Sequence, residues 1–202
     1  VFISGNVSNP GKIVPRRFLT VFSERVNPEP FKQGSGRLAL ANKIVGVAGP
    51  LTSRVWVNRV WGWHFGEHLV RTPSDFGAQG KKPTHPQLLD DLAARFVKNG
   101  WSLKWLHREI MLSATYRQAS RPIKLAKQAD PTNLWLWRKG PNRLDIEAWR
   151  DTILQASGEL KLTMGGPSEN IDLKNSTRRS VYSKISRSLL HPLFQLYDFP
   201  VA

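Results

Sequence analysis

The chain has 202 residues and a formal net charge of +15 at pH 7, from 30 Lys and Arg against 15 Asp and Glu. Its hydrophobic content of 40%, with eight Trp and nine Phe, supports a buried core and excludes general disorder. The lack of Cys excludes disulfides, thiolate nucleophiles and Cys-ligated zinc, and no apolar run approaches the ~18 residues of a membrane-spanning helix.

The first 34 residues contain many Pro and Gly and few periodic apolar positions. This composition predicts that residues 1–34 form an extended segment packed on the domain. Residues 35–202 are predicted to form a single helical domain. Because the chain lacks an initiating Met and stops without a closing element, we expect it to be a fragment that is truncated at its C-terminus.

Two helices are expected next. Residues 35–45 predict a short helix that ends at the glycines that follow it. A second helix over 53–65 has Thr52 or Ser53 as its N-cap and stops at Gly66, since glycine adopts the left-handed C-cap conformation at little cost. The many Val and Trp residues of this helix predict that it is deeply packed.

The following two helices are expected to form a hairpin. Residues 67–83 show no sustained period and predict a long loop, a type of segment that often carries function. Four residues from Thr84 fit a capping box, and apolar positions follow at i, i+4 and i+8, so a helix is predicted over 84–98. An Asn-Gly pair breaks that helix, and Ser102 caps another over 102–117.

The last part of the chain is expected to be more mixed. Residues 145–157 predict a helix with four inward positions, Ile146, Trp149, Ile153 and Ala156. Alternation over 179–185 predicts one strand, paired with residues from the 160s or from the N-terminal segment. A short helix is predicted over 192–197. The fold class is therefore mainly α: a helical domain with a helix hairpin, at most a small β-sheet, and long loops.

Motifs along nearly the whole chain resemble one known family. In order they are SRVWVNRVW (53–61), HFG (64–66), LVRTPSDFG (69–77), PTHP (83–86), GWSLK (100–104), SATYRQ (113–118), MGGP (164–167), RRSVY (178–182) and YDFP (197–200). On these motifs the sequence resembles the planctomycete-type domain of unknown function 1553.

The resemblance implies a domain of large exported bacterial proteins, located in the periplasm or at the cell surface. In such proteins a cytochrome c-like module and a second domain of unknown function often precede this one. The resemblance implies no known activity. Because the family's domain continues past the Asp-Phe-Pro motif, a C-terminal part is expected to be missing here.

The run HFGEH at 64–68 fits the inverted zincin pattern, in which two His bind zinc and a Glu activates water. The residues in question are His64, Glu67 and His68. Gly66 lies inside the motif, where the helix is expected to end, and an interrupted helix cannot place both imidazoles on one face. We therefore favour no metal site and keep a metal-dependent hydrolase as an alternative function.

A polar site is expected around the long loop. The candidate ligand-binding residues are Arg59, Arg71, Asp75 and His85. Arg71 and Asp75 lie within seven residues of each other, His85 directly precedes the next helix, and Arg59 interrupts an apolar helix. Turn formation by Asp75, or an ion pair between Arg71 and Asp75, would explain the same residues without a ligand.

His107 and the tryptophans are expected to be structural. His107 lies on the apolar face of its helix, which is typical of a hydrogen-bonded core histidine. Helical spacing favours core positions over a carbohydrate-stacking platform for Trp56, Trp61, Trp63, Trp101, Trp105 and Trp149. Arg178 and Arg179 could contact an anion, although Arg is common at element ends.

With no coherent catalytic set and no cofactor motif, the sequence favours a non-catalytic interaction or scaffolding module, without a cofactor in this fragment. The expected partners are neighbouring domains of the parent protein, including cytochrome c-like modules, and acidic polysaccharide. A polyanion-binding domain is the second alternative function. Sequence-specific nucleic-acid binding is not expected, because the basic residues are dispersed and no known nucleic-acid module accompanies them.

Overall fold

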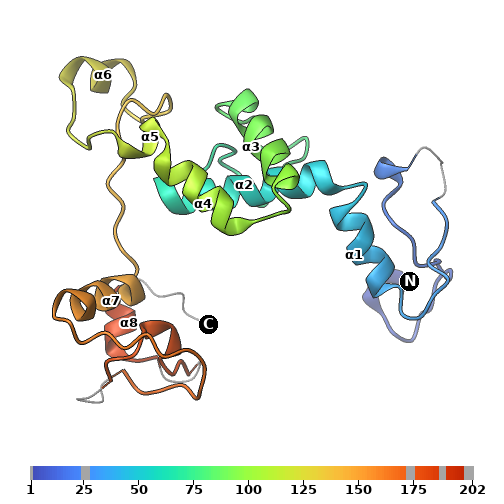
Figure 1. The fold of residues 1–202 in the computed structure, drawn as a ribbon. Coiled ribbons are helices and arrows are strands. Elements are labelled where there is room, and N and C mark those ends of the chain that lie inside the picture. The colour runs from blue at the N-terminus through green and yellow to red at the C-terminus, as the bar shows by residue number, and fades with distance from the viewer. Residues whose placement is uncertain (1, 24–27, 172–175, 187–189, 198–202) are drawn as a thin grey trace. The chain divides into compact units, whose positions relative to one another are not determined.

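The computed structural model describes residues 2–23, 28–171, 176–186 and 190–197 (Figure 1). Within these ranges there are eight α-helices, three 3-10 helices and no β-sheet, so the predicted mainly helical class with long loops is confirmed. No helix in the same ranges combines the length and hydrophobicity needed to cross a membrane.

The chain divides into two compact units, residues 1–141 and residues 142–202. The single domain expected over 35–202 stays a prediction. The first unit contains the 3-10 helices Ile3–Gly5 and Thr20–Phe22 and the helices α1 (Arg37–Val45), α2 (Gly49–Phe65), α3 (Pro86–Lys98), α4 (Leu103–Leu112), α5 (Ala114–Arg117) and α6 (Lys124–Ala129). The four helices predicted over 35–117 are thus present, with corrected ends.

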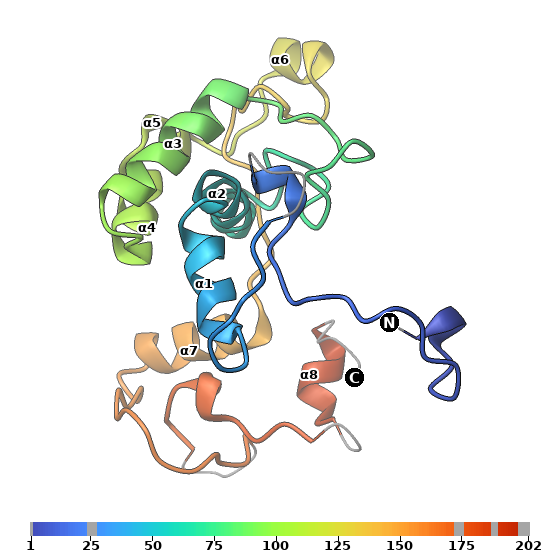
Figure 2. The same cartoon turned by 90° about the vertical axis from the view of Figure 1, so that its right-hand side faces the viewer.

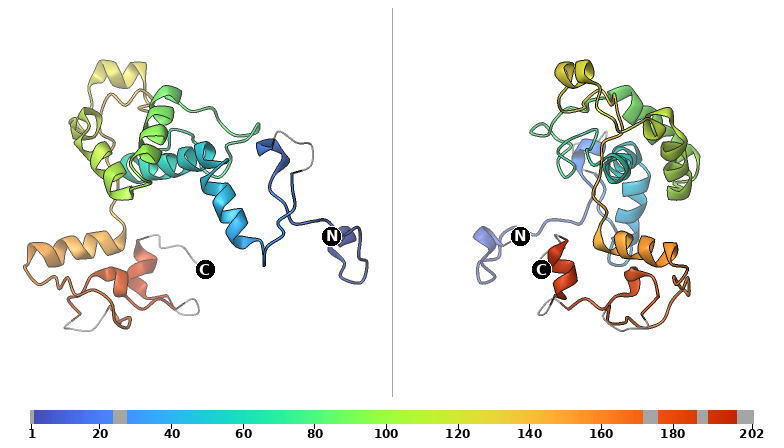
Figure 3. Two further views of the ribbon diagram at one scale, coloured as in Figure 1. Left: turned by 45° about the vertical axis from the view of Figure 1, so that its right-hand side comes forward. Right: turned by 90° about the vertical axis from the view of Figure 1, so that its left-hand side faces the viewer.

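The core of the first unit lies where α3 and α4 pack against α2 (Figure 2). Its buried side chains include Val57, Val60, Trp61 and Phe65 of α2, Leu89, Leu92 and Phe96 of α3, and Leu106 and Ile110 of α4. Leu92 and Leu106 are therefore core residues, as the helical spacing predicted. The helix α1 meets α2 at a bend after Gly46 (Figure 3).

The prediction that six tryptophans are buried is wrong for three of them. Trp61 is buried, and Trp101 and Trp105 are half-buried against the core. Trp56, Trp63 and Trp149 are exposed. For Trp56 and Trp63 the reason is geometric: α2 buries the face that carries Val57, Val60 and Trp61, and the positions seven residues apart at 56 and 63 lie away from it.

Several helix ends differ from the predictions because side chains find other partners. The helix α2 starts at Gly49, since Pro50 fits a first turn and Thr52 is already inside the helix, where its hydroxyl donates to the Ala48 carbonyl at 3.1 Å. The expected capping box is absent: the Thr84 hydroxyl donates to the Leu69 carbonyl, and His85 occupies the N-cap of α3.

The predicted cap at Ser102 is confirmed, because its Oγ accepts from the Trp105 N–H at 3.2 Å. The helix expected over 102–117 is broken at Ser113, which has an extended backbone. Its hydroxyl oxygen accepts from the Tyr116 N–H at 3.2 Å and so caps the short α5. The break turns the chain and brings Tyr116 toward the end of α2.

The second unit contains α7 (Ile146–Ala156), a 3-10 helix over Ser180–Tyr182, and α8 (Pro192–Leu196). The strand predicted over 179–185 is wrong. In place of a strand, the described residues show isolated bridges to the 160s, Lys161 with Arg178 and Glu169 with Ser183. The Ser180 N–H donates to Asp151 of α7 at 2.7 Å, so a side chain takes the place of a ladder partner.

The inward face predicted for α7 is also largely wrong. Ile146 is buried, but Trp149, Ile153 and Ala156 are exposed. The polar side chains of Arg150 and Asp151 add hydrogen bonds between the helix and residues 178–180 of its unit. Of the closing YDFP motif, Tyr197 contacts the Trp149 ring at 5.4 Å between centroids, and the residues at 198–200 lie outside the described ranges.

Candidate functional site: a histidine and lysine cluster beside an exposed face of helix α4

Four segments of the first unit bring titratable and aromatic side chains together at the end of α2. Gly66 ends this helix in the left-handed conformation, with φ of 78°. In the last turn before it, His64 Nε2 lies 2.8 Å from His107 Nδ1 of α4, which is a hydrogen bond. The Tyr116 ring stands edge-on to both His64 and Phe65. The predicted hydrogen bonding of His107 is confirmed.

Lys139 closes the cluster from the loop that follows α6. Its ammonium donates to the His64 carbonyl and lies over the rings of Phe65 and Tyr116, at 4.6 and 4.1 Å from their centroids. A cation at this point also complements the negative end of the α2 dipole. Burial lowers the pKa of the Lys139 ammonium, because the charged form loses solvation.

The surroundings of the His64 imidazole lower its pKa and so favour the neutral form. Burial lowers its pKa first, and the nearby His107 and Lys139 lower it further because a second positive charge is unfavourable there. Within the His64 and His107 pair, one nitrogen therefore donates and the other accepts. The pair joins α2 to α4 through a polar contact. Protonation of His64 would disturb this contact, because it adds a positive charge beside His107 and Lys139.

The HFGEH motif does not assemble as a metal site. Because α2 ends at Phe65, Glu67 and His68 lie beyond the helix, and Glu67 pairs with Arg71 at 3.6 Å. The His68 ring packs over Gly62, so closely that a Cβ there would lie 2.4 Å from its Nε2. In the part of the chain that the structure describes, no group of three His, Asp or Glu residues could hold a metal ion.

The four candidate ligand-binding residues occupy separate local positions. Arg59 is exposed on α2, and Arg71 pairs with Glu67. Asp75 Oδ1 accepts from the Gly77 N–H at 2.8 Å, which forms a turn, and His85 Nδ1 lies 3.0 Å from the Thr84 hydroxyl. No contact joins any two of the four in the described ranges. Their binding role stays a prediction.

One polar residue of α2 is buried among apolar neighbours and has two hydrogen-bond partners. The side chain of Asn58 is fully buried. Its Nδ2 donates to the Val70 carbonyl at 3.0 Å, and its Oδ1 accepts from the Val70 N–H at 2.7 Å. The amide thus satisfies both backbone groups of one loop residue, and it fixes the start of the long loop against α2.

The outer face of α4 borders the cluster. A shallow hollow of about 480 Å³ is lined there by Lys104, His107, Arg108, Met111 and Leu112. The opposite face of α4 is buried through Leu106 and Ile110. The outer face therefore combines two basic side chains with two exposed apolar ones, and His107 connects it to the cluster.

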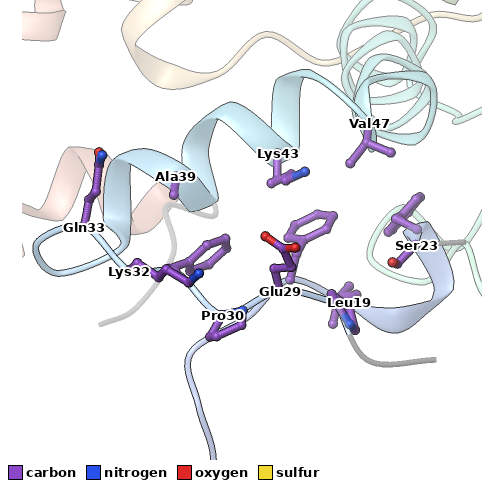
Figure 4. A pocket seen from close by; sticks show the side chains of 13 residues that line it. Leu19, Ser23, Glu29, Pro30, Lys32, Gln33, Ala39, Lys43 and Val47 are labelled. Atoms are coloured by element: carbon purple, nitrogen blue, oxygen red, sulfur yellow. The ribbon is translucent and has the colours of Figure 1, made fainter. Parts of the chain in front are cut away.

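A larger hollow of about 610 Å³ lies between α1 and the described residues 18–23 and 28–33 (Figure 4). Aromatic residues Phe18, Phe22 and Phe31 line it. Lys43 of α1 and Glu29 of the N-terminal segment point into the space between the two walls (Figure 4). This groove is open to solvent, and its walls carry both apolar and charged side chains.

Sequence reasoning missed the contributions of Tyr116 and Lys139 to the cluster. Lys139 lies 75 positions from His64, and a contact over that separation leaves no local periodicity. The available signal was His107, a polar residue on an apolar helix face, which required a partner. That partner, His64, is also the first residue of the HFGEH motif.

Comparison with known proteins identifies a family. The model of a family described as PSD1, a protein of unknown function (DUF1553), matches residues 36–202. The match includes the cluster and both faces of α4, whereas residues 18–23 and 28–33, which form one wall of the larger hollow, lie outside it. No curated protein and no solved structure gives a significant match.

Proposed function

The chain belongs to the DUF1553 (PSD1) family, and we propose that this domain is a non-catalytic interaction or scaffolding module. The parent is proposed to be a large exported bacterial protein with several domains. By the family resemblance, the partners are its neighbouring domains, among them cytochrome c-like modules.

The observation that carries the proposal is that four buried or half-buried polar side chains, spread over both units, bind the chain's own backbone. Asn58 holds Val70, and Lys139 holds the His64 carbonyl. The buried Asp130 accepts from the Trp135 N–H at 2.8 Å. In the second unit, Arg150 donates to the Arg178 carbonyl at 3.1 Å. Groups used in this way are structural links rather than reactive groups facing a substrate.

The outer face of α4 supports the same proposal. Met111 and Leu112 are exposed beside Lys104 and Arg108, and exposed apolar groups rimmed by polar ones are typical of protein-binding surfaces. The two cations favour a partner with an acidic surface. We therefore assign the contact with the neighbouring module to this face.

The test is a calorimetric titration of the chain with the cytochrome c-like module of its own parent protein. We expect a dissociation constant of about micromolar, as for small polar interfaces. Leu112→Glu should weaken it by at least about tenfold, because it places an acid in the centre of the face. Leu125→Glu, at an exposed site on α6, is the matched control and should leave affinity unchanged.

Two results would refute this proposal. The first is that Leu112→Glu and Leu125→Glu change the affinity for the cytochrome c-like module equally. The other is stoichiometric zinc in the purified chain that is lost in His64→Ala, since a hydrolase built on His64, Glu67 and His68 requires it.

A further inference from the structure

Three side chains share the exposed face of α2 that points away from the core. They are Trp56, Arg59 and Trp63, at positions i, i+3 and i+7, and this set is called the Trp–Arg stripe below. Trp63 is 62% exposed and Trp56 is 38% exposed. Large indoles at such exposure leave apolar area in water, which is costly unless a ligand covers it.

The stripe also carries an uncompensated positive charge. The sequence of α2 contains no acidic residue. Its other arginine, Arg54, pairs with Asp90 of α3 at 3.0 Å. In the ranges that the structure describes, no ion pair involves Arg59, which is exposed. The guanidinium thus lies between two indoles and can bind an anion.

The spacing suits a linear ligand with a long repeat. At a rise of 1.5 Å per residue, Trp56 and Trp63 are about 10.5 Å apart along the helix axis, with Arg59 between them. This spacing is close to the length of a disaccharide. Sugars present apolar C–H faces that pack on indole rings, and a uronic acid presents a carboxylate that the Arg fork binds with two hydrogen bonds.

We propose that the Trp–Arg stripe binds an acidic polysaccharide with one carboxylate per disaccharide. Alternate sugars pack on Trp56 and Trp63, and Arg59 binds the carboxylate between them. The stripe lies on α2, so this site is separate from the α4 face and does not depend on the partner assigned there.

Nucleic acid fits the stripe less well. Single strands carry one phosphate per nucleotide, and proteins that bind them provide a basic groove along the backbone. The stripe provides one cation between its two rings. A polymer with widely spaced charges matches that arrangement better than one with a charge on every unit.

The experiment measures the affinity of the whole chain for hyaluronan oligosaccharides, which have one carboxylate per disaccharide. Trp63→Ala should weaken binding by about tenfold or more, as loss of a central aromatic contact does. Arg59→Gln should do the same, and Arg59→Lys should have an intermediate effect because the planar fork is lost. Binding should change little with salt, since one charge pair is involved.

Matched controls separate the stripe from the general charge of the chain. Trp135→Ala removes an indole that is 69% exposed elsewhere in the first unit, and Arg37→Gln removes an exposed cation of α1. Neither should change the affinity for hyaluronan. Heparin and duplex DNA should bind with a steep salt dependence that the stripe variants leave unchanged.

Four outcomes would overturn the proposal. The first two are that hyaluronan does not bind, and that Trp63→Ala and Trp135→Ala lose binding equally. The other two are that single-stranded DNA binds more tightly through the same three residues, and that the chain forms a dimer that Trp63→Ala dissociates. The last two assign the stripe to nucleic acid or to a second copy of the chain. None of these results affects the titration with the neighbouring module, so the two proposals fail separately. Circular dichroism confirms that each variant is folded.

Discussion

The helices α2, α3 and α4 and the described part of residues 142–202 are stabilised in different ways. The first region, together with Leu69 and Val70 of the loop after α2, buries a dozen apolar side chains in one cluster. In the second, the buried side chains within the described ranges are Ile146, Ser180 and Phe194. There, Arg178 donates to the Pro167 carbonyl and to Glu169, at 3.1 and 3.0 Å, and also to the Gly165 carbonyl.

The comparison shows which sequence signals report on which kind of stability. Apolar burial leaves a helical period in the sequence, and the core positions of α3 and α4 follow it. A network of arginine and carbonyl groups leaves no period. The network does explain why the MGGP and RRSVY motifs occur together. Arg178 of the RRSVY motif binds carbonyl groups of the turn that the MGGP motif forms.

Removing a core side chain should have the largest effect. Leu106→Ala should reduce the free energy of unfolding by about 2–5 kcal/mol, because Leu106 is fully buried and leaves a cavity. Ile153→Ala on α7 is the contrasting change, and since Ile153 is 47% exposed it should cost less than about 0.5 kcal/mol. Urea unfolding measures both. Similar losses for the two variants would remove the distinction between the regions.

The buried amide of α2 should come next. Asn58→Ala leaves the Val70 N–H and carbonyl without their partners and should cost about 1–3 kcal/mol. Hydrogen exchange should show faster exchange at the start of the long loop. If exchange there stays as slow as in the unchanged protein, Asn58 does not hold the loop.

The arginine network should be sensitive to geometry rather than to charge. Arg178→Lys keeps the positive charge but loses the planar fork, and we expect a loss of about 1 kcal/mol, confined to the second unit. Arg37→Lys, at an exposed site of α1, is the control and should be neutral. Hydrogen exchange of both units checks this, and an effect of equal size on α2 to α4 would contradict it.

The smallest effect concerns pH and the histidine pair. The pKa of His64 is lowered in the folded chain from the ordinary value of 6.5, so between the two values the unfolded chain binds more protons. Stability should therefore fall as the pH decreases below about 6.5. Thermal unfolding at several pH values measures this.

Two variants test the origin of that dependence. His64→Gln should reduce it, and His107→Gln should reduce it partly, because one of the groups that lowers the pKa is then removed. A slope that remains unchanged in His64→Gln would assign the dependence to other groups.

The cluster could be predicted only in part. His107 indicated a hydrogen-bond partner, which is His64, and the bond between them is half-buried. Lys139 and Tyr116 gave no signal, since their contacts with the end of α2 depend on the break at Ser113 and on the loop after α6. The sequence showed the tryptophans of the Trp–Arg stripe at helical spacing. Such spacing predicts that the residues share one face of the helix, but it does not predict whether that face is buried.

The sequence by itself determined where α1 to α4, α7 and α8 lie, the glycine stop at Gly66 and the family, because apolar periods and glycine stops are local, whereas α6 and the break at Ser113 were not predicted. Only the tertiary structure decided which side of α2 is buried, that His64 pairs with His107, and that Asp151 binds the Ser180 N–H where the sequence predicted a strand. The physical reason is that these outcomes depend on contacts between residues far apart in the chain. Such contacts are selected by burial and hydrogen-bond satisfaction over the whole fold.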